Sequence, residues 1–173
     1  MALIQKRDLP NTLTLANLGC GVMSLMMLFQ ANYNWSVFFI LLACVADRYD
    51  GSVARYLNVS SELGKELDSL ADLVSFGVAP SILVFNVHGF SQLGILGYLL
   101  VVLFPMAGAY RLARYNVTKF DGEFYGIPIT FAGLLMALYC LVITYYAVPI
   151  LISVVLVIGL SYLMVCKHRF KKF

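Results

Sequence analysis

Charged residues are scarce in this chain of 173 residues: Asp, Glu, Lys and Arg make up 12% of it, whereas hydrophobic residues make up 61%. The mean hydropathy of +0.86 lies outside the usual range of soluble domains. The composition therefore predicts an integral membrane protein. The formal net charge of +3 is small for a nucleic-acid-binding protein, so we expect no nucleic acid among its partners.

Closely spaced cysteine pairs and the sequence pattern of a cleavable leader are also lacking. The four cysteines lie singly in apolar segments and form no CxxC pair, which argues against a zinc site or a disulfide framework and favours buried free thiols. The first apolar run, residues 12–31, is long enough to span a bilayer and is not followed by a small-residue cleavage site. We therefore expect an uncleaved first helix.

Long apolar runs fill most of the chain. A membrane-spanning helix needs roughly 20 mostly apolar residues. Six stretches meet this need: residues 12–31, 35–57, 63–86, 91–115, 127–147 and 149–168. No internal repeat or second domain is left over. The sequence predicts one all-α transmembrane domain over residues 1–173, with six transmembrane helices.

The charged residues that are present fall in four places, at residues 6–8, 47–72, 111–123 and 167–172. With six spans, all four places lie on one side of the membrane, and the three opposite connections, near Asn32, His88 and Ala147, carry no charge. Lys and Arg mark cytoplasmic loops. We therefore predict a multi-pass protein of the cell membrane with both termini in the cytoplasm. The basic ends are expected to contact anionic lipid headgroups.

Four aspartates lie where two of these spans approach the cytoplasmic side. Asp47 and Asp50 are three residues apart, Asp68 and Asp72 are four apart, and each pair therefore shares one helix face. The short connection at residues 58–61 makes the two helices antiparallel neighbours, so the four carboxylates converge and should face inward. Two divalent cations would balance their charge, and oxygen ligands favour Mg²⁺ or Mn²⁺, with Ca²⁺ as an alternative, over zinc.

Small residues lie on the same helix faces. Gly51 and Ala54 accompany the first pair of aspartates and Gly64 accompanies the second, which leaves room for a ligand near the backbone. Close helix packing is the alternative explanation. Arg55 lies one residue beyond this face. It could bind a phosphate through its fork of donors, or extend to the lipid headgroups.

Read together, residues 47–55 have the sequence DRYDGSVAR, and Gly64, Asp68 and Asp72 follow at fixed spacing. This pattern resembles the signature of the CDP-alcohol phosphotransferase family at every fixed position. The resemblance covers nearly the whole chain. It implies a six-helix membrane fold, a homodimer, and an active site open to the cytoplasmic leaflet.

The resemblance also implies a reaction, in which a phosphatidyl group passes from a CDP-linked lipid to an alcohol and CMP leaves. Asp47, Asp50 and Asp68 would be metal ligands. Asp72 would complete the metal shell and act as the general base on the acceptor hydroxyl. The residues implied to bind the CDP-lipid are Asp50, Gly51, Ala54, Arg55 and Gly64.

The rest of the chain narrows the acceptor. Residues 72–80, 110–116 and 124–130 resemble the phosphatidylserine synthase branch, which implies phospholipid biosynthesis by transfer from CDP-diacylglycerol, or from an archaeal CDP-ether lipid, to L-serine. Arg111 and Arg114 lie three apart on one helix face and are candidates for binding the serine carboxylate. Topology-setting basic residues are the alternative.

Two other functions stay open at this point. Another acceptor, such as glycerol 3-phosphate or inositol phosphate, would call for additional basic residues, and beyond Arg111, Arg114 and Lys119 few are available. A cation transporter would place acids near mid-membrane, with a polar path to the far side. Here the aspartates lie toward one end of their helices and the opposite connections are uncharged.

Overall fold

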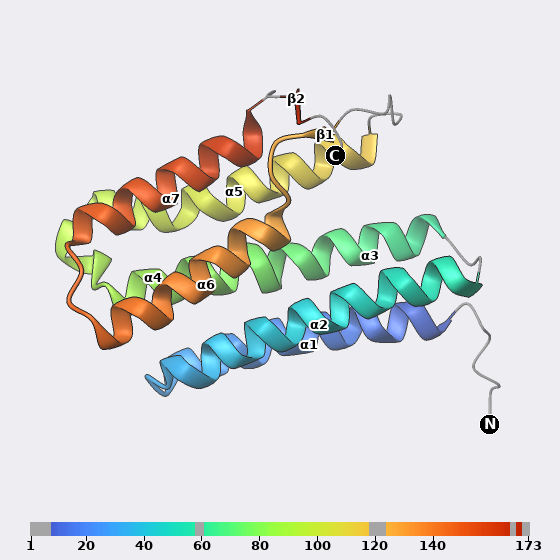
Figure 1. The fold of residues 1–173 in the computed structure, drawn as a ribbon, viewed down its shortest axis with the longest axis horizontal. Coiled ribbons are helices and arrows are strands. Elements are labelled where there is room, and N and C mark those ends of the chain that lie inside the picture. The colour runs from blue at the N-terminus through green and yellow to red at the C-terminus, as the bar shows by residue number, and fades with distance from the viewer. Residues whose placement is uncertain (1–7, 58–60, 118–123, 167–168, 171–173) are drawn as a thin grey trace.

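A computed structural model describes residues 8–57, 61–117, 124–166 and 169–170, which form an elongated helical bundle (Figure 1). Its elements are α1 (Asp8–Phe29), α2 (Tyr33–Leu57), α3 (Glu62–Asp72), the π-helical segment η1 (Leu73–Val78), α4 (Ala79–Val87), the short 3₁₀ helix η2 (Phe90–Leu93), α5 (Ile95–Val117), α6 (Ile129–Tyr145) and α7 (Ile150–Val165). Two strands of two residues each, β1 (Phe124–Tyr125) and β2 (Arg169–Phe170), pair in antiparallel register.

These elements form six helical rods, because α3, η1 and α4 continue one another from Glu62 to Val87. The rods follow the six predicted spans, with ends that differ by a few residues. The all-α class is confirmed, and the sequence did not predict the short β1–β2 pair. Residues 6–7, the connection 58–60, Lys119 and residues 171–172, on which some predictions rest, lie outside the described residues.

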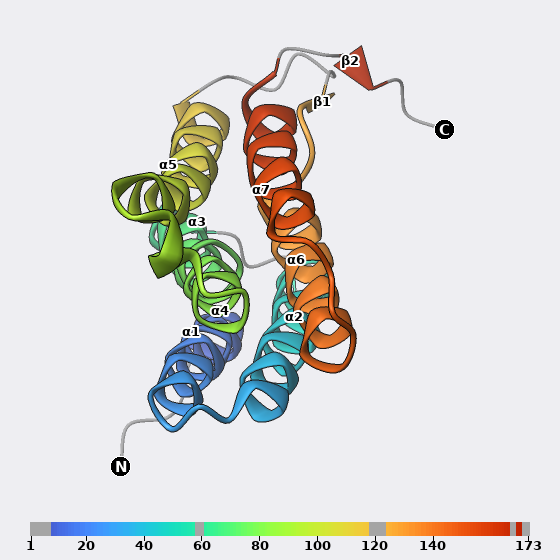
Figure 2. The same cartoon turned by 90° about the vertical axis from the view of Figure 1, so that its left-hand side faces the viewer.

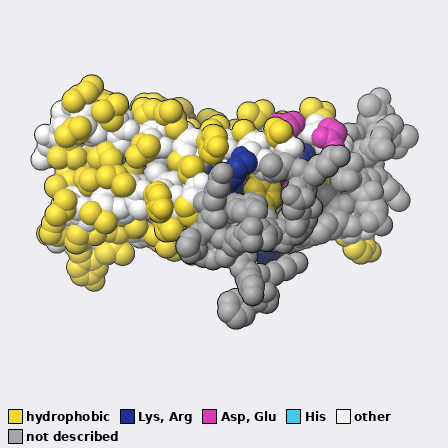
Figure 3. All heavy atoms as spheres, turned by 90° about the horizontal axis from the view of Figure 1, so that it is seen from above, with side chains coloured by type: hydrophobic (Ala, Val, Ile, Leu, Met, Phe, Trp, Pro, Cys, Tyr) yellow, Lys and Arg dark blue, Asp and Glu magenta, His cyan; other side chains and the backbone are white. Residues whose placement is uncertain are grey.

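Three helical rods are long and apolar enough to cross a membrane, namely Pro10–Phe29, Glu62–Val87 and Ile95–Val117. Ile129–Tyr145 and Ile150–Val165 are apolar but shorter. At 1.5 Å per residue they span about 25 Å, somewhat less than the ~30 Å hydrocarbon core of a bilayer. On the face drawn in Figure 3, hydrophobic side chains cover the end that holds the α6–α7 connection, and the Lys, Arg, Asp and Glu side chains lie toward the opposite end.

Seen end-on, the helices stand in two layers (Figure 2). One layer holds α1, the α3–α4 rod and α5, and the other holds α2, α6 and α7. Contacts between α1 and α2, α4 and α6, and α5 and α7 join the layers. The core between them includes Phe76, Phe104 and Met136, which are completely buried. This arrangement places the α3–α4 rod in the middle of the molecule.

The π-helical segment η1 lies where both α1 and α6 approach that rod closely. The Ala79 N–H donates to the Val74 carbonyl, five residues back, instead of four as in an α-helix. On one side α1 approaches so closely that a Cβ on Gly21 would collide with Ser75, and on the other side a Cβ on Gly133 of α6 would collide with the Phe76 backbone. Such segments are frequent near functional sites, and this one directly follows Asp72.

A polar network closes the bundle at the end where the connections are uncharged. The Tyr139 and Ser153 hydroxyls lie 2.7 Å apart, Ser153 contacts His88 Nδ1, and His88 Nε2 lies 2.9 Å from the Val148 carbonyl. Because a carbonyl only accepts, Nε2 carries the hydrogen and Nδ1 accepts from Ser153. The network ties α6, α7 and their connection to the residue that follows α4.

Candidate functional site

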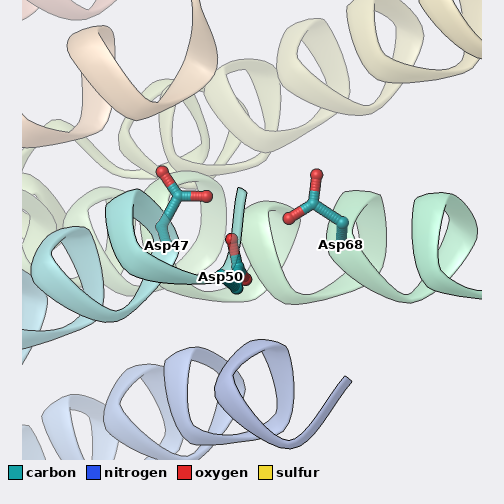
Figure 4. A group of neighbouring side chains, drawn as sticks. All are labelled: Asp47, Asp50 and Asp68. Atoms are coloured by element: carbon teal, nitrogen blue, oxygen red, sulfur yellow. The ribbon is translucent and has the colours of Figure 1, made fainter. Parts of the chain in front are cut away.

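Three of the four predicted aspartates come together between α2 and α3. Asp47, Asp50 and Asp68 each offer a carboxylate oxygen, and these oxygens all lie within 4.8 Å of one another. In Figure 4 the carboxylates of Asp47 and Asp68 face each other across the gap between the helices, and Asp50 lies between them. Asp50 is buried, whereas Asp47 and Asp68 are half-buried.

The N-terminus of α3 is fixed locally, which sets the position of Asp68. The Ser61 hydroxyl accepts a hydrogen bond from the Gly64 N–H at 3.0 Å and so caps the helix. Glu62 in the first turn adds a favourable charge at the positive end of the helix dipole. Asp68 then lies on the second turn, directed at α2.

This set of ligands fits a divalent cation. Even at 4.8 Å, the upper limit of the separations in this cluster, two carboxylate charges repel by about 3 kcal/mol at an effective dielectric constant of about 20. A bound cation removes that repulsion, and an all-carboxylate site suits hard ions such as Mg²⁺, Mn²⁺ or Ca²⁺. The cluster is therefore suited to hold metal, as the sequence predicted.

Asp72 lies one turn farther along the rod than Asp68 and is not one of the three aspartates whose oxygens lie within 4.8 Å of one another, but its side chain contacts that of Asp47. It is buried, with 7% of its surface exposed. Asn17 Nδ2 in α1 donates to Asp72 Oδ1 at 3.2 Å, and the Thr130 hydroxyl in α6 lies 3.5 Å from Asp72 Oδ2. Asp47 and Asp68 remain within electrostatic range of it. The predicted participation of Asp72 in the metal shell stays a prediction.

Residues of α1 support the acids, and the sequence interpretation did not include them. The Thr14 hydroxyl lies 3.0 Å from Asp50 Oδ2 and 3.1 Å from the Pro10 carbonyl, and Asn17 contacts Asp72. One signal was available. In the otherwise apolar first span, Thr14, Asn17, Gly21 and Ser24 recur at intervals of three or four residues, which places polar and small residues on one helix face.

The predicted ligand-binding residues are described in part. Gly51 follows Asp50 in α2 and is half-buried. A Cβ on Gly64 would lie 3.0 Å from Asn11 Oδ1 and 3.1 Å from Ser61 Oγ, so glycine here permits the start of α1 to approach α3. Ala54 and Arg55 belong to α2, but their side chains lie outside the described part of the chain.

The two predicted arginines have different surroundings. Arg111 is 8% exposed, its guanidinium lies 5.2 Å from the centre of the Tyr115 ring, and its Nε has no hydrogen-bond partner among the described residues. Asp72 lies within its electrostatic range. Arg114 instead donates to the Val165 carbonyl at the end of α7, at 3.2 Å.

Contacts between α3 and α5 place Arg111 relative to the aspartates. Lys65 Nζ donates to the Asn116 carbonyl at 3.1 Å, and Asn116 Nδ2 donates to Glu66 at 3.2 Å and to Ser69 at 3.0 Å. These bonds hold the C-terminal end of α5 against the helix that carries Asp68.

Comparison with known proteins identifies the family of this chain. Residues 7–165 match the model of the CDP-alcohol phosphatidyltransferase family. The CDP-diacylglycerol–serine O-phosphatidyltransferase of Bacillus subtilis is 38% identical over 166 residues, which cover 95% of this chain and 90% of that protein. The enzyme of the same name from Methanocaldococcus jannaschii is 37% identical over 78% of this chain and 62% of its own length. The archaetidylserine synthase of Methanothermobacter thermautotrophicus is 37% identical over 72% of this chain and 54% of its own length. The chain belongs to the CDP-alcohol phosphatidyltransferase family.

Proposed function

We propose that this protein transfers the phosphatidyl group of a CDP-lipid to the hydroxyl of L-serine and releases CMP, as a step of phospholipid biosynthesis. The serine oxygen attacks the phosphorus that carries the lipid ester, and the bond from that phosphorus to the oxygen of CMP breaks. The electron pair leaves with CMP, and the serine proton passes to a base. Diacylglycerol and archaeal ether lipids are both candidate lipids, because relatives of either name match the chain.

Asp47, Asp50 and Asp68 would hold the divalent metal, with Asp72 beside them. Bound there, the metal would neutralise the pyrophosphate oxygens and the charge that develops on the departing CMP. The three convergent carboxylates support this assignment. The protein contributes a fixed geometry, because Asp50 is held by Thr14 and Asp68 lies on a capped helix.

Asp72 is the proposed general base. It lies one helical turn from Asp68 in the aspartate cluster and is buried, and its two oxygens face donors from different helices. A base must lie within about 2.6–3.2 Å of the donor atom whose proton it takes. A carboxylate that cannot rotate freely meets this condition more often than a mobile one. The contacts of Asp72 with Asn17 in α1 and Thr130 in α6 therefore suit it to this role.

The acceptor is proposed to bind between Asp72 and Arg111. Arg111 forms no ion pair with a carboxylate of the described residues, and a buried guanidinium is costly unless an anion pairs with it. The carboxylate of free serine supplies that anion while its hydroxyl reaches toward Asp72. Arg114 donates to α7, which supports a role in holding the helices, although the sequence interpretation placed both arginines at the acceptor.

The CDP-lipid is proposed to enter from the cytoplasmic leaflet of the cell membrane and to bind along Asp50, Gly51, Ala54, Arg55 and Gly64. The charged residues, which fall in four stretches on one side of the predicted six-span topology, support this orientation. We further propose that the protein acts as a homodimer, as the family resemblance implies.

The observation that carries the proposal is the convergence of Asp47, Asp50 and Asp68, with Asp72 one turn away, in a chain of this family. The test uses purified protein, CDP-diacylglycerol, Mn²⁺ and a panel of labelled alcohols: L-serine, glycerol 3-phosphate and inositol phosphate. CMP release and a new lipid are expected with L-serine and with neither of the other two alcohols. Transfer to a phosphorylated alcohol in preference to serine would refute the acceptor, and failure of metal removal to stop the reaction would refute the metal site.

A further inference from the structure

Asn17 is the buried polar residue of α1 that touches the proposed base. Its side chain is 0% exposed, and its Nδ2 donates to Asp72 Oδ1 at 3.2 Å. Its backbone carbonyl accepts a hydrogen bond from Ser75 Oγ at 3.0 Å. Asn17 is therefore bonded on both sides of the point where α3 ends and η1 begins.

The burial of Asn17 decides what kind of role it can have. An atom that a water molecule cannot reach is also out of reach of a substrate atom of similar size. Asn17 therefore touches neither serine nor the CDP-lipid in this conformation, and any effect on the reaction must pass through Asp72.

The orientation of the Asn17 amide carries information about Asp72. The amide oxygen, Oδ1, has no hydrogen-bond partner among the described residues. A buried acceptor without a partner is unfavourable, and turning the amide by half a rotation would exchange its two ends. An ionised carboxylate only accepts hydrogen bonds, so that rotation would place two acceptors against each other. With Asp72 ionised, as a general base must be, the orientation that turns the amide N–H toward Asp72 is the favourable one.

We propose that Asn17 is a positioning residue for the transfer reaction: its amide N–H fixes the rotamer of the Asp72 carboxylate, so that one oxygen stays aimed at the acceptor hydroxyl. This inference rests on the proposed role of Asp72 as base. Thr130 contacts the other carboxylate oxygen at the longer distance of 3.5 Å, so Asn17 is the stronger of the two supports.

The experiment compares Asn17→Ala and Asn17→Asp with wild type in the full chain, using CDP-diacylglycerol, L-serine and Mn²⁺. Loss of a hydrogen bond to a charged group corresponds to about a ten- to hundredfold change. We expect kcat to fall by that factor in Asn17→Ala, while both KM values stay within about threefold of wild type. Asn17→Asp keeps the size of the side chain but places a second carboxyl group against Asp72, which either repels Asp72 or shares a proton with it, and should lower kcat at least as much.

Ser24→Ala is the matched control. Ser24 lies on the same face of α1, is buried, and shares a 2.8 Å hydrogen bond with Ser36, far from the aspartates along the helix. Thermal unfolding of all variants in the same detergent reports any general loss of packing. The control should lose stability comparable to Asn17→Ala and keep the wild-type kcat.

Three results would overturn the inference: a wild-type kcat in either Asn17 variant, a loss confined to KM, or an equal loss of kcat in Ser24→Ala. If Asp72→Asn itself turned over at the wild-type rate, Asp72 would not be the base, and the positioning role of Asn17 would be refuted as well. If the wild-type protein used another alcohol, the serine assignment alone would fail. The same comparison, made with that alcohol, would then decide the role of Asn17.

Discussion

Replacement of Arg111 and Arg114 by lysine should have different effects, although the two residues are three apart on one helix. Lysine keeps the charge and removes the planar fork that binds a carboxylate through two hydrogen bonds. Arg111 is 8% exposed and its Nε is unpartnered among the described residues, whereas Arg114 already donates to the Val165 carbonyl. The acceptor should therefore depend on Arg111.

The size of the effect follows from the burial. One charge-assisted hydrogen bond contributes about 1.5–3 kcal/mol, equivalent to roughly a ten- to hundredfold change in affinity. Water has little access to Arg111 and cannot replace a lost hydrogen bond. Arg111→Lys should therefore raise the KM for serine by a factor near the upper end of this ten- to hundredfold range. Arg114→Lys removes a bond to a neutral carbonyl and should lower the free energy of unfolding by about 0.5–1.5 kcal/mol, with little change in this KM.

Initial rates of CMP release, measured while serine and CDP-diacylglycerol are varied in turn, separate the two substrates. The KM for CDP-diacylglycerol should change much less than the KM for serine in Arg111→Lys. Thermal unfolding of both variants in one detergent gives the stability difference. A normal serine KM in Arg111→Lys, or a loss restricted to the CDP-lipid, would refute the acceptor assignment and place Arg111 at the donor.

Three further predictions concern the metal site, the packing and the topology. Asp68→Asn should abolish metal-dependent turnover, whereas Asp72→Asn should keep Mn²⁺ and CDP-lipid binding and lose about 10²–10⁴-fold in kcat. Calorimetric titration with Mn²⁺ and rate measurements check this. An equal loss of Mn²⁺ binding in the two variants would contradict the prediction. Gly133→Ala forces a Cβ against backbone and should destabilise the fold by about 1–3 kcal/mol, whereas Gly159→Ala, with open space around it, should not; thermal unfolding tests the pair. A cysteine placed at Tyr146 in a cysteine-free background should react with an impermeant reagent added outside intact cells, and protection there would reverse the proposed topology.

The sequence was sufficient to predict the helical rods. Long apolar runs separated by short polar connections leave few other arrangements in a membrane. It was not sufficient to predict η1, because residues 73–78 read as an uninterrupted apolar helix. The extra residue per turn accompanies close packing against Gly21 and Gly133, which belong to distant parts of the chain.

The acidic site was predictable to the extent that local spacing determines it. The intervals within each helix place the aspartates on one face, and the short connection at residues 58–61 makes the two helices neighbours, which brings Asp47, Asp50 and Asp68 together. The supports of the site could not be derived in this way, because Thr14, Asn17 and Thr130 reach the aspartates across 36, 55 and 58 residues of sequence. Helical spacing likewise gave no reason to separate Arg111 from Arg114. They differ because α7 lies beside Arg114, which donates a hydrogen bond to the Val165 carbonyl.

The π-helical segment also changes the direction in which side chains point around the axis of the central rod, so that the part before it and the part after it are rotated relative to each other. One extra residue in a turn offsets everything beyond it by about 100° around the axis. The face that presents Asp68 and Asp72 to the other acids and the face that buries Ala79 and Leu83 in the core are therefore not the faces that one straight α-helix would align. If a single residue were deleted from Leu73–Val78, the rod could keep its carboxylates aimed or its apolar side packed, but not both.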